Sequence, residues 1–259
     1  MPFQTNGNIR YFQFEQLNHG LTQAVFTRRG GVSPDPWAAL NLGSTVGDDP
    51  KRVHENRQLA LAALGRDPAS VYDVWQVHGV EVIIAEAPRS PESPHLQADA
   101  ILTDRPGLTL MMRFADCVPI MLHDPVRKVV GIVHAGWMGT VLGTVRLAVE
   151  AMQKRYGSNS ADILAAIGPS IGPDHYEIGP DVVIQVQQAF GNDTTSLLSV
   201  NAGHMKFDLW AANRLLLEQA GVCHIEVAGL CTACHTEDWY SHRAGKGRTG
   251  RFGAIIALV

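Results

Sequence analysis

The stretch ADCVPIMLHDPVRKVVGIVHAGWMGT, residues 115–140, decides how the most reactive side chains of this chain are held. Asp124-Pro125 is a turn signal that separates two short apolar runs, 118–122 and 129–133. Both runs are rich in residue types that favour strands. The pattern predicts a β-hairpin that begins after a cysteine and ends on a histidine.

Cys117 and His134 then lie together at the open end of this hairpin. They are expected to be directly opposite each other or one residue out of register, with Cβ atoms roughly 5–8 Å apart. A thiol beside an imidazole suits either a metal site or a nucleophile paired with a base. The hairpin alone leaves both possibilities open.

The composition indicates a globular protein of 259 residues, with 46% apolar residues and a net charge of -4. This charge gives no reason to expect a nucleic acid or an anionic membrane surface as a partner. The first twenty residues lack a basic start followed by a long apolar run, and no segment reaches the length of a membrane span. We therefore expect a cytoplasmic protein whose four cysteines are free thiols or metal ligands.

The rest of the pattern predicts a mixed α/β (α+β) fold in which mixed β-sheets are flanked by helices. We expect a single layered domain over residues 1–259, because no linker or repeat interrupts the pattern. Turn signals and apolar periodicity predict strands at 23–27, 71–77, 99–103, 108–114, 118–123, 129–134, 223–230 and 252–258. Helices are predicted from Asp48 to about Leu64 and at 140–156, 181–190 and 208–220.

Three of the predicted strands end on a reactive side chain with a glycine close by: His78 in WQVHG, Cys117 in FADC and His134 in IVHAGW. Two histidines and a cysteine suit zinc, and three protein ligands leave a fourth position open, as in catalytic sites. Asp116 is a candidate to hold a ligand histidine or to help activate a water, although it could also cap a turn. Taken singly, a histidine such as His78 is more often an ordinary buried or surface residue than a ligand.

Two glycine-rich loops are candidates to bind an anion. TRRGGVS at 27–33 is followed by NLG at 41–43, and a second loop, 241–251, carries four basic residues among glycines. Arginines with free backbone around them can hold a phosphate or carboxylate, although a solvated basic loop is the alternative. The proposed substrate-binding residues are Arg28, Asn41, Arg243 and Arg251.

The segment Cys231-Thr-Ala-Cys234-His235 fits the pattern of covalent haem attachment. Haem attachment is rejected because it needs export and the chain shows no export signal. A redox pair or half of a zinc site are further alternatives, but the sequence offers no second CxxC pair. Unpaired cysteines at a strand end are the favoured interpretation.

The ordered set of motifs resembles the YfiH family, also called the multicopper polyphenol oxidase (laccase) domain family and related to the animal purine nucleoside phosphorylase of laccase-domain type. The matching motifs are TRRGGVS, NLG, QVHG, ADA, ADCVPIML, HAGW, IGPSIGPDHYEIG, CT, SHR and TGR. The resemblance implies a fold also similar to bacterial deamidating toxins. It further implies a zinc site built from His78, Cys117 and His134.

The resemblance also implies purine nucleoside phosphorylase activity, accompanied by adenosine deaminase and S-methyl-5′-thioadenosine phosphorylase activities, with a nucleoside and phosphate as partners. Two positions depart from the family pattern, since Met138 and Ala244 stand where arginine is usual. Each change removes a potential anion contact.

Two other functions stay open. The first is a copper-dependent polyphenol oxidase, although none of the 11 histidines forms a His-x-His pair of the kind that multicopper sites use. The second is a hydrolase that edits cell-wall precursors, in which Cys117 is the nucleophile and His134 its base. His78 discriminates between zinc and nucleophile, because only the zinc site needs it.

Overall fold

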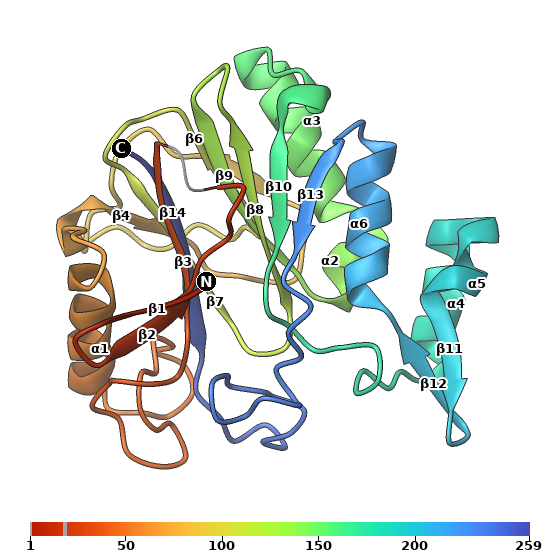
Figure 1. Cartoon of the computed structure of the whole chain (residues 1–259), viewed down its shortest axis with the longest axis horizontal. Helices are drawn as coiled ribbons and strands as arrows, with labels where there is room; N and C mark the ends of the chain where they lie inside the picture. The colour runs from red at the N-terminus through yellow and green to blue at the C-terminus, as the bar shows by residue number, and fades with distance from the viewer. Residues whose placement is uncertain (1, 18–19) are drawn as a thin grey trace.

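The computed structural model describes residues 2–17 and 20–259, and its strands form two six-stranded sheets and a separate hairpin (Figure 1). The first sheet has the spatial order β1 (Phe3–Asn6), β2 (Ile9–Phe12), β3 (Leu21–Phe26), β14 (Phe252–Leu258), β7 (Thr109–Phe114) and β4 (Val71–Asp73). The second has the order β13 (His224–Val227), β10 (Leu164–Ile167), β8 (Val118–Asp124), β9 (Val129–Ala135), β6 (Ala100–Thr103) and β5 (Val82–Ile84).

Both sheets are mixed, because the edge pairs β4/β7, β5/β6 and β10/β13 are parallel and the other pairs are antiparallel. The helices are α1 (Pro50–Ala62), α2 (Trp137–Leu142), α3 (Thr144–Tyr156), α4 (Pro180–Phe190), α5 (Thr194–Leu197) and α6 (Leu209–Gln219). Three 3₁₀ turns occur at Pro68–Ser70, Ser160–Asp162 and Gly191–Asp193. The small hairpin of β11 (Leu198–Asn201) and β12 (His204–Phe207) lies beside α4 and α5, far from α1 (Figure 1).

The two sheets form layers with the helices, because their strands are buried on both faces. The helix α1 packs on the outer face of the first sheet through Ala60 and Leu61. The inner faces of the two sheets share one apolar core, and α3 and α6 cover the outer face of the second sheet (Figure 1). This arrangement confirms the predicted mixed α/β fold with helices flanking mixed sheets.

Side-chain alternation along the β8/β9 hairpin directs the site residues between the sheets. On β9, Val129 and Val133 face the helices, whereas Val130 and Ile132 face the other sheet. His134 has the same parity as Ile132 and therefore points inward, toward the first sheet. Cys117 packs against the same inter-sheet core from the residue before β8.

The register of the hairpin differs from the prediction. Pro119 is the residue opposite His134, so Cys117 is displaced by two positions instead of none or one. A two-residue offset keeps both side chains on the same face of the sheet, where diagonal neighbours remain within reach. The two side chains therefore still meet, although the expected pairing was wrong.

Other boundaries also differ. The predicted helix at 140–156 is divided into two helices, α2 and α3. The break occurs at Gly143, which adopts the left-handed conformation at φ 77° and ends α2. In addition, α2 begins earlier than expected. The predicted strand at 71–77 ends at Asp73, and the chain beyond it turns to bring His78 into place. Strands β1, β2, β5 and β10 and the β11/β12 hairpin lie outside the predicted set.

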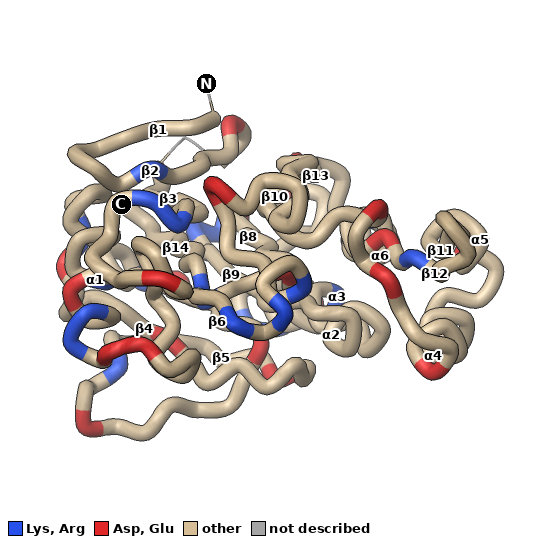
Figure 2. Tube along the Cα trace, turned by 90° about the horizontal axis from the view of Figure 1, so that it is seen from below, with Lys and Arg blue, Asp and Glu red and all other residues tan. Residues whose placement is uncertain are grey.

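Acidic and basic residues are interspersed along the trace (Figure 2). Within residues 2–17 and 20–259, none of the helices combines the length and apolar character needed to cross a bilayer.

Asn56 on α1 ties the first glycine-rich loop to the fold. It is fully buried, its amide donates to Ser33 Oγ and the Asn41 carbonyl at 2.9 Å each, and its oxygen accepts from Val32 N at 2.8 Å. We predict that Asn56→Ala lowers the free energy of unfolding by about 2–4 kcal/mol, because several buried polar groups lose their partner.

Urea denaturation followed by circular dichroism measures this effect. The matched control is Glu55→Ala, an exposed neighbour on the same helix, which should change stability by less than about 0.5 kcal/mol. Equal stability of the Asn56→Ala variant and the wild type would contradict the assignment of this loop anchor.

Candidate functional site

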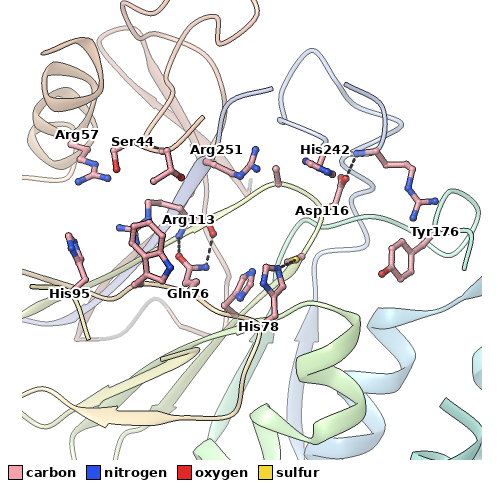
Figure 3. Close-up of a pocket in the computed structure, with 17 residues that line it drawn as sticks. Ser44, Arg57, Gln76, His78, His95, Arg113, Asp116, Tyr176, His242 and Arg251 are labelled. Atoms are coloured by element: carbon pink, nitrogen blue, oxygen red, sulfur yellow. Dashed lines mark hydrogen bonds between the residues drawn. The ribbon is translucent and has the colours of Figure 1, made fainter. Parts of the chain in front are cut away.

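A cavity of about 480 Å³ opens at the ends of the strands that carry the reactive residues (Figure 3). Its walls come from distant segments of the chain. Basic and polar side chains gather at one end, where Figure 3 shows Ser44, Arg57, His95, Arg113 and Arg251. Asp116, Tyr176 and His242 lie at the other end, and His78 lies between the two groups (Figure 3).

The structure brings His78, Cys117 and His134 together in this cavity. Their potential ligand atoms all lie within 4.8 Å of one another, and Cys117 Sγ is 3.8 Å from His78 Nε2. The two imidazole rings meet edge to face, with centroids 4.9 Å apart. A Cβ at Gly136 would lie 3.0 Å from both Cys117 Sγ and His78 Cδ2, so a glycine there lets the side chains approach.

The buried carboxylate of Asp99 organises these residues. Its oxygens accept hydrogen bonds from three successive backbone amides, Val77 N at 3.1 Å, His78 N at 3.0 Å and Gly79 N at 2.7 Å. Oδ1 also contacts His134 Nδ1 at 2.7 Å. The same carboxylate therefore shapes the turn that carries His78, whose φ is 60°, and orients the ring of His134.

Desolvation opposes ionisation of Asp99, but the hydrogen bond and charge of His134 together with the backbone donors hold the pKa of this carboxyl below its usual value. The sequence pattern predicted no role for Asp99. The available signal was an aspartate within an apolar strand, since a buried carboxylate needs partners.

The donor set fits a zinc ion. Thiolate and imidazole are ligands that zinc prefers, and tetrahedral bonds of about 2.0–2.3 Å place neighbouring ligand atoms about 3.3–3.8 Å apart. The carboxylate on His134 Nδ1 leaves Nε2 as the ligand atom, which is the usual arrangement around a metal-bound histidine. A fourth position would open on the cavity.

The charges of the three residues support thiolate formation. Burial disfavours the charged thiolate, but the charge and hydrogen bond of His134, followed by those of His78, lower the pKa of the Cys117 thiol to about 6. Burial likewise disfavours a charged imidazole, but Cys117 and Asp99 raise the pKa of His134 to about 9. In the absence of a metal, both pKa shifts favour a thiolate paired with an imidazolium.

One proposed role of Asp116 was to hold a ligand histidine, but its carboxylate contacts other groups. Its Oδ1 accepts from Thr232 Oγ1 at 2.7 Å and its Oδ2 accepts from Arg243 N at 2.6 Å. The residue adopts a φ of 82°, so it stands at a turn and joins two loops at the cavity wall. Asp99 has the histidine-holding role instead.

The four proposed substrate-binding residues divide into two pairs. Arg243 and Arg251 line the cavity. Arg28 lies elsewhere, where it donates to the carbonyls of Ala38 and Thr236 and stacks on Tyr240.

Asn41 is also outside the lining and is fully buried. Its Oδ1 accepts from Gly43 N at 3.0 Å and Arg251 N at 2.9 Å, and its Nδ2 donates to Asp48. Asn41 therefore positions the backbone of a cavity residue and does not itself face the cavity.

Two further arginines reach the cavity from elements that the sequence analysis did not connect to it. Arg57 projects from α1 and donates to the Leu42 carbonyl, and burial together with the nearby charge of Arg113 lowers its pKa to about 10. Arg113 on β7 pairs with Asp73 at 2.6 Å. A helical arginine is ordinarily solvated, so the sequence pattern carried no signal for Arg57.

The departures from the family pattern lie away from this charge cluster. Met138, 40% exposed on α2, and Ala244 are both absent from the residues that line the cavity in the described part of the chain. Arg57, Arg113 and Arg251 supply the positive charge there.

Alkylation tests the charge state of Cys117. In metal-free protein, we predict that the rate of modification by iodoacetamide rises through pH 6 and is nearly level above about pH 7, because the thiolate forms above its lowered pKa. Peptide mass spectrometry measures the rate at each cysteine.

Cys234 is the internal comparison, since burial and the neighbouring Cys231 and Asp174 raise its pKa to about 12 and delay its modification to alkaline pH. A Cys117 rate that keeps rising beyond pH 8 would contradict the proposed stabilisation by His134.

Known proteins with similar sequences and structures agree with the family resemblance of the motifs. A Deinococcus radiodurans protein named purine nucleoside phosphorylase is 41% identical over 241 residues, which cover 93% of this chain and 90% of the relative. The crystal structure of YlmD from Geobacillus stearothermophilus matches with a TM-score of 0.92 and 32% identity, over 99% of this chain and 98% of that one.

The Bacillus licheniformis hypothetical protein YfiH is similar to the same extent, with a TM-score of 0.90, 33% identity and coverage of 100% and 99%. The sequence profile described as multi-copper polyphenol oxidoreductase laccase matches residues 22–259. These matches confirm the resemblance seen in the motifs: the chain belongs to this laccase-like family, and it is similar to the Bacillus licheniformis YfiH chain over nearly the full length of both.

Proposed function

We propose that the protein is a zinc-dependent purine nucleoside phosphorylase that also has adenosine deaminase and S-methyl-5′-thioadenosine phosphorylase activities. The carrying observation is that one cavity contains both a Cys/His metal-ligand cluster and a group of arginines. The name of the Deinococcus radiodurans relative supports the nucleoside substrate. We further propose that residues 1–259 act as one catalytic domain, because the two sheets share a core.

In phosphorolysis, a phosphate oxygen forms a bond to C1′ of the ribose while the bond from C1′ to the purine nitrogen breaks. Arg57, Arg113 and Arg251 would hold the phosphate, since guanidinium groups match its geometry and charge. Their positions at one end of the cavity leave the other end for the nucleoside (Figure 3).

The other end of the cavity provides contacts for the sugar and the base. Tyr176 offers an aromatic surface and Arg243 stacks on its ring with the guanidinium 5.2 Å from the ring centroid. Asp116 and His242 are candidates to exchange a proton with the departing base. A bound zinc ion would act as a Lewis acid at His78, Cys117 and His134.

A cysteine hydrolase is the second candidate. The observation that favours it is the thiolate–imidazolium character of Cys117 and His134, which also describes an activated nucleophile. Asp99 would then orient His134 in the manner of a third triad member.

The copper oxidase has less support. In residues 2–17 and 20–259, the clusters of potential metal ligands number two and contain three histidines in total, His78, His134 and His175. A multicopper centre needs many histidines close together, so we rank this chemistry below the other two.

His78→Ala separates the first two candidates. With zinc as the working group, the variant should lose metal from this site and at least 100-fold in adenosine turnover, because one of three protein ligands is missing. Cys117→Ala should behave in the same way. A His78→Ala protein that keeps most of its activity, while Cys117→Ala has none, would favour the nucleophile.

Arg251→Ala tests the phosphate end of the cavity. We predict an increase of about 10-fold or more in the KM for phosphate, with a smaller change in the KM for adenosine, because a charge-assisted contact contributes about 1.5–3 kcal/mol. Steady-state kinetics with phosphate as the varied substrate measure this.

The matched control is Arg248→Ala, an exposed arginine of the same loop that is outside the cavity lining. Its kinetic constants should stay within about twofold of the wild type, since an exposed charge contributes little. Equal effects of the two substitutions would contradict a specific phosphate contact.

A further inference from the structure

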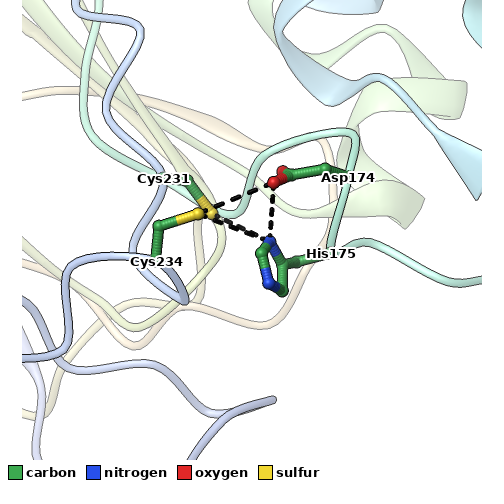
Figure 4. Close-up of side chains that lie close together, drawn as sticks. All are labelled: Asp174, His175, Cys231 and Cys234. Atoms are coloured by element: carbon green, nitrogen blue, oxygen red, sulfur yellow. Dashed lines mark hydrogen bonds and ion pairs between the residues drawn. The ribbon is translucent and has the colours of Figure 1, made fainter.

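A second group of potential ligands lies on two loops, one of which also carries Tyr176 of the cavity lining. The loop between β10 and α4 contributes Asp174 and His175, and the segment after β13 contributes Cys231 and Cys234. Figure 4 shows the four side chains pointing toward one another. None of them belongs to the cluster at His78, and the function proposed above does not use them.

The ligand atoms of the four side chains lie close enough together to share one metal ion. Cys231 Sγ and Cys234 Sγ lie 3.7 Å and 3.5 Å from His175 Nδ1. Cys234 Sγ is 3.6 Å from Asp174 Oδ2, and this oxygen is 3.0 Å from His175 Nδ1. All the ligand atoms lie within 4.8 Å of one another.

The three distances that involve sulfur match those of tetrahedral zinc. Bonds of about 2.3 Å to sulfur and 2.0–2.2 Å to nitrogen and oxygen give edges of about 3.5–3.6 Å between sulfur and a lighter ligand atom. The edge between nitrogen and oxygen would be about 3.4 Å, so Asp174 and His175 would separate by about 0.4 Å from their present ion pair.

The backbone around Cys231 holds its sulfur in place. Gly172 N donates to Cys231 Sγ at 3.2 Å, and a Cβ at Gly172 would lie only 3.3 Å from this sulfur and 2.8 Å from Asp174 Oδ1. Ser170 pairs with Cys231 as an isolated parallel bridge, so the two segments are held in register. The position of Cys231 is therefore set by the surrounding backbone before any metal binds.

We propose that Asp174, His175, Cys231 and Cys234 form a second metal site, which binds one zinc ion with four protein ligands and has a structural role. Four protein ligands close the coordination sphere, as in structural zinc sites. The sequence favoured unpaired cysteines because it contains no second CxxC pair. The missing ligands come instead from an Asp-His step 56 to 60 residues earlier in the chain.

A metal at this place would fix one wall of the cavity. Tyr176, which lines the cavity, directly follows His175. Thr232, which donates to Asp116, directly follows Cys231. A zinc ion would thus join the two loops next to the cavity lining, much as a disulfide would, without taking part in the reaction.

Metal analysis of purified protein tests the proposal, with His78→Ala used to empty the first site. The His78→Ala protein should retain about one equivalent of zinc, and His78→Ala combined with Cys234→Ser should retain none. The matched control is Cys223→Ser, which replaces an exposed cysteine outside both clusters and should leave the zinc of the His78→Ala protein unchanged.

Cobalt substitution gives a second readout in case a variant folds poorly. Metal-free His78→Ala protein, kept reduced, should bind one equivalent of Co²⁺ and develop the thiolate charge-transfer and visible d–d bands of a tetrahedral two-thiolate site. Zinc should also raise the melting temperature of this protein, because it binds only the folded loops.

His78→Ala protein that neither retains zinc nor develops these bands would overturn the proposal. Rapid formation of a Cys231–Cys234 disulfide in metal-replete protein would do the same and would assign the pair to redox chemistry. Either failure leaves the nucleoside assignment untouched, because that assignment rests on the other cluster.

Discussion

The arrangement of the site depends on the carboxylate of Asp99. This group is fully buried and receives four hydrogen bonds, from three amides of the 77–79 turn and from the ring of His134. A buried carboxylate without partners would cost several kcal/mol, so its position and those of its donors determine one another. One side chain thereby sets the geometry of two of the three potential metal ligands.

The third potential ligand is held by the hairpin. Cys117 enters from the residue before β8 and faces the inter-sheet space with His134, because an offset of two residues keeps them on one face. Gly136 leaves room for the sulfur and the ring of His78 to meet. The cluster of potential metal ligands is thus held by two strands and one turn with positive φ, which is a suitable framework for a preorganised centre.

The remainder of the cavity is built from loops that the fold brings to the same edge. Asn41 and Asn56 hold the first glycine-rich loop, and Asp116 ties the 241–251 loop to the segment that follows β13. These buried polar side chains hold the loops in place, because their hydrogen bonds would be lost if the loops moved. Arginines from a helix, a strand and a loop then face one space.

The sequence predicted what depends on local pattern. The β8/β9 hairpin, α1 and the strand β14 follow from apolar periodicity and turn residues, and the motifs identified the family. The register of the hairpin was missed because an offset of two residues buries the same side chains as an offset of zero. Asp99 and Arg57 were missed because their partners are distant in sequence and become neighbours only through the packing of the two sheets.

The partners of the CxxC segment were also missed because they are distant in sequence. Cys231 and Cys234 have an obvious spacing, but the residues that complete their cluster lie on a loop after β10. The parallel pairing of β10 with β13 places these two segments side by side. Pairs of strands that are far apart in sequence therefore decide which reactive residues meet.

The most direct test of the central claim is the reaction of adenosine and phosphate with protein stripped of metal and then reloaded with zinc. The account predicts that stripped protein releases neither adenine nor ribose 1-phosphate, and that zinc restores both products in equal amounts. Full activity of the stripped protein, or a zinc-loaded protein that releases neither product, would contradict it.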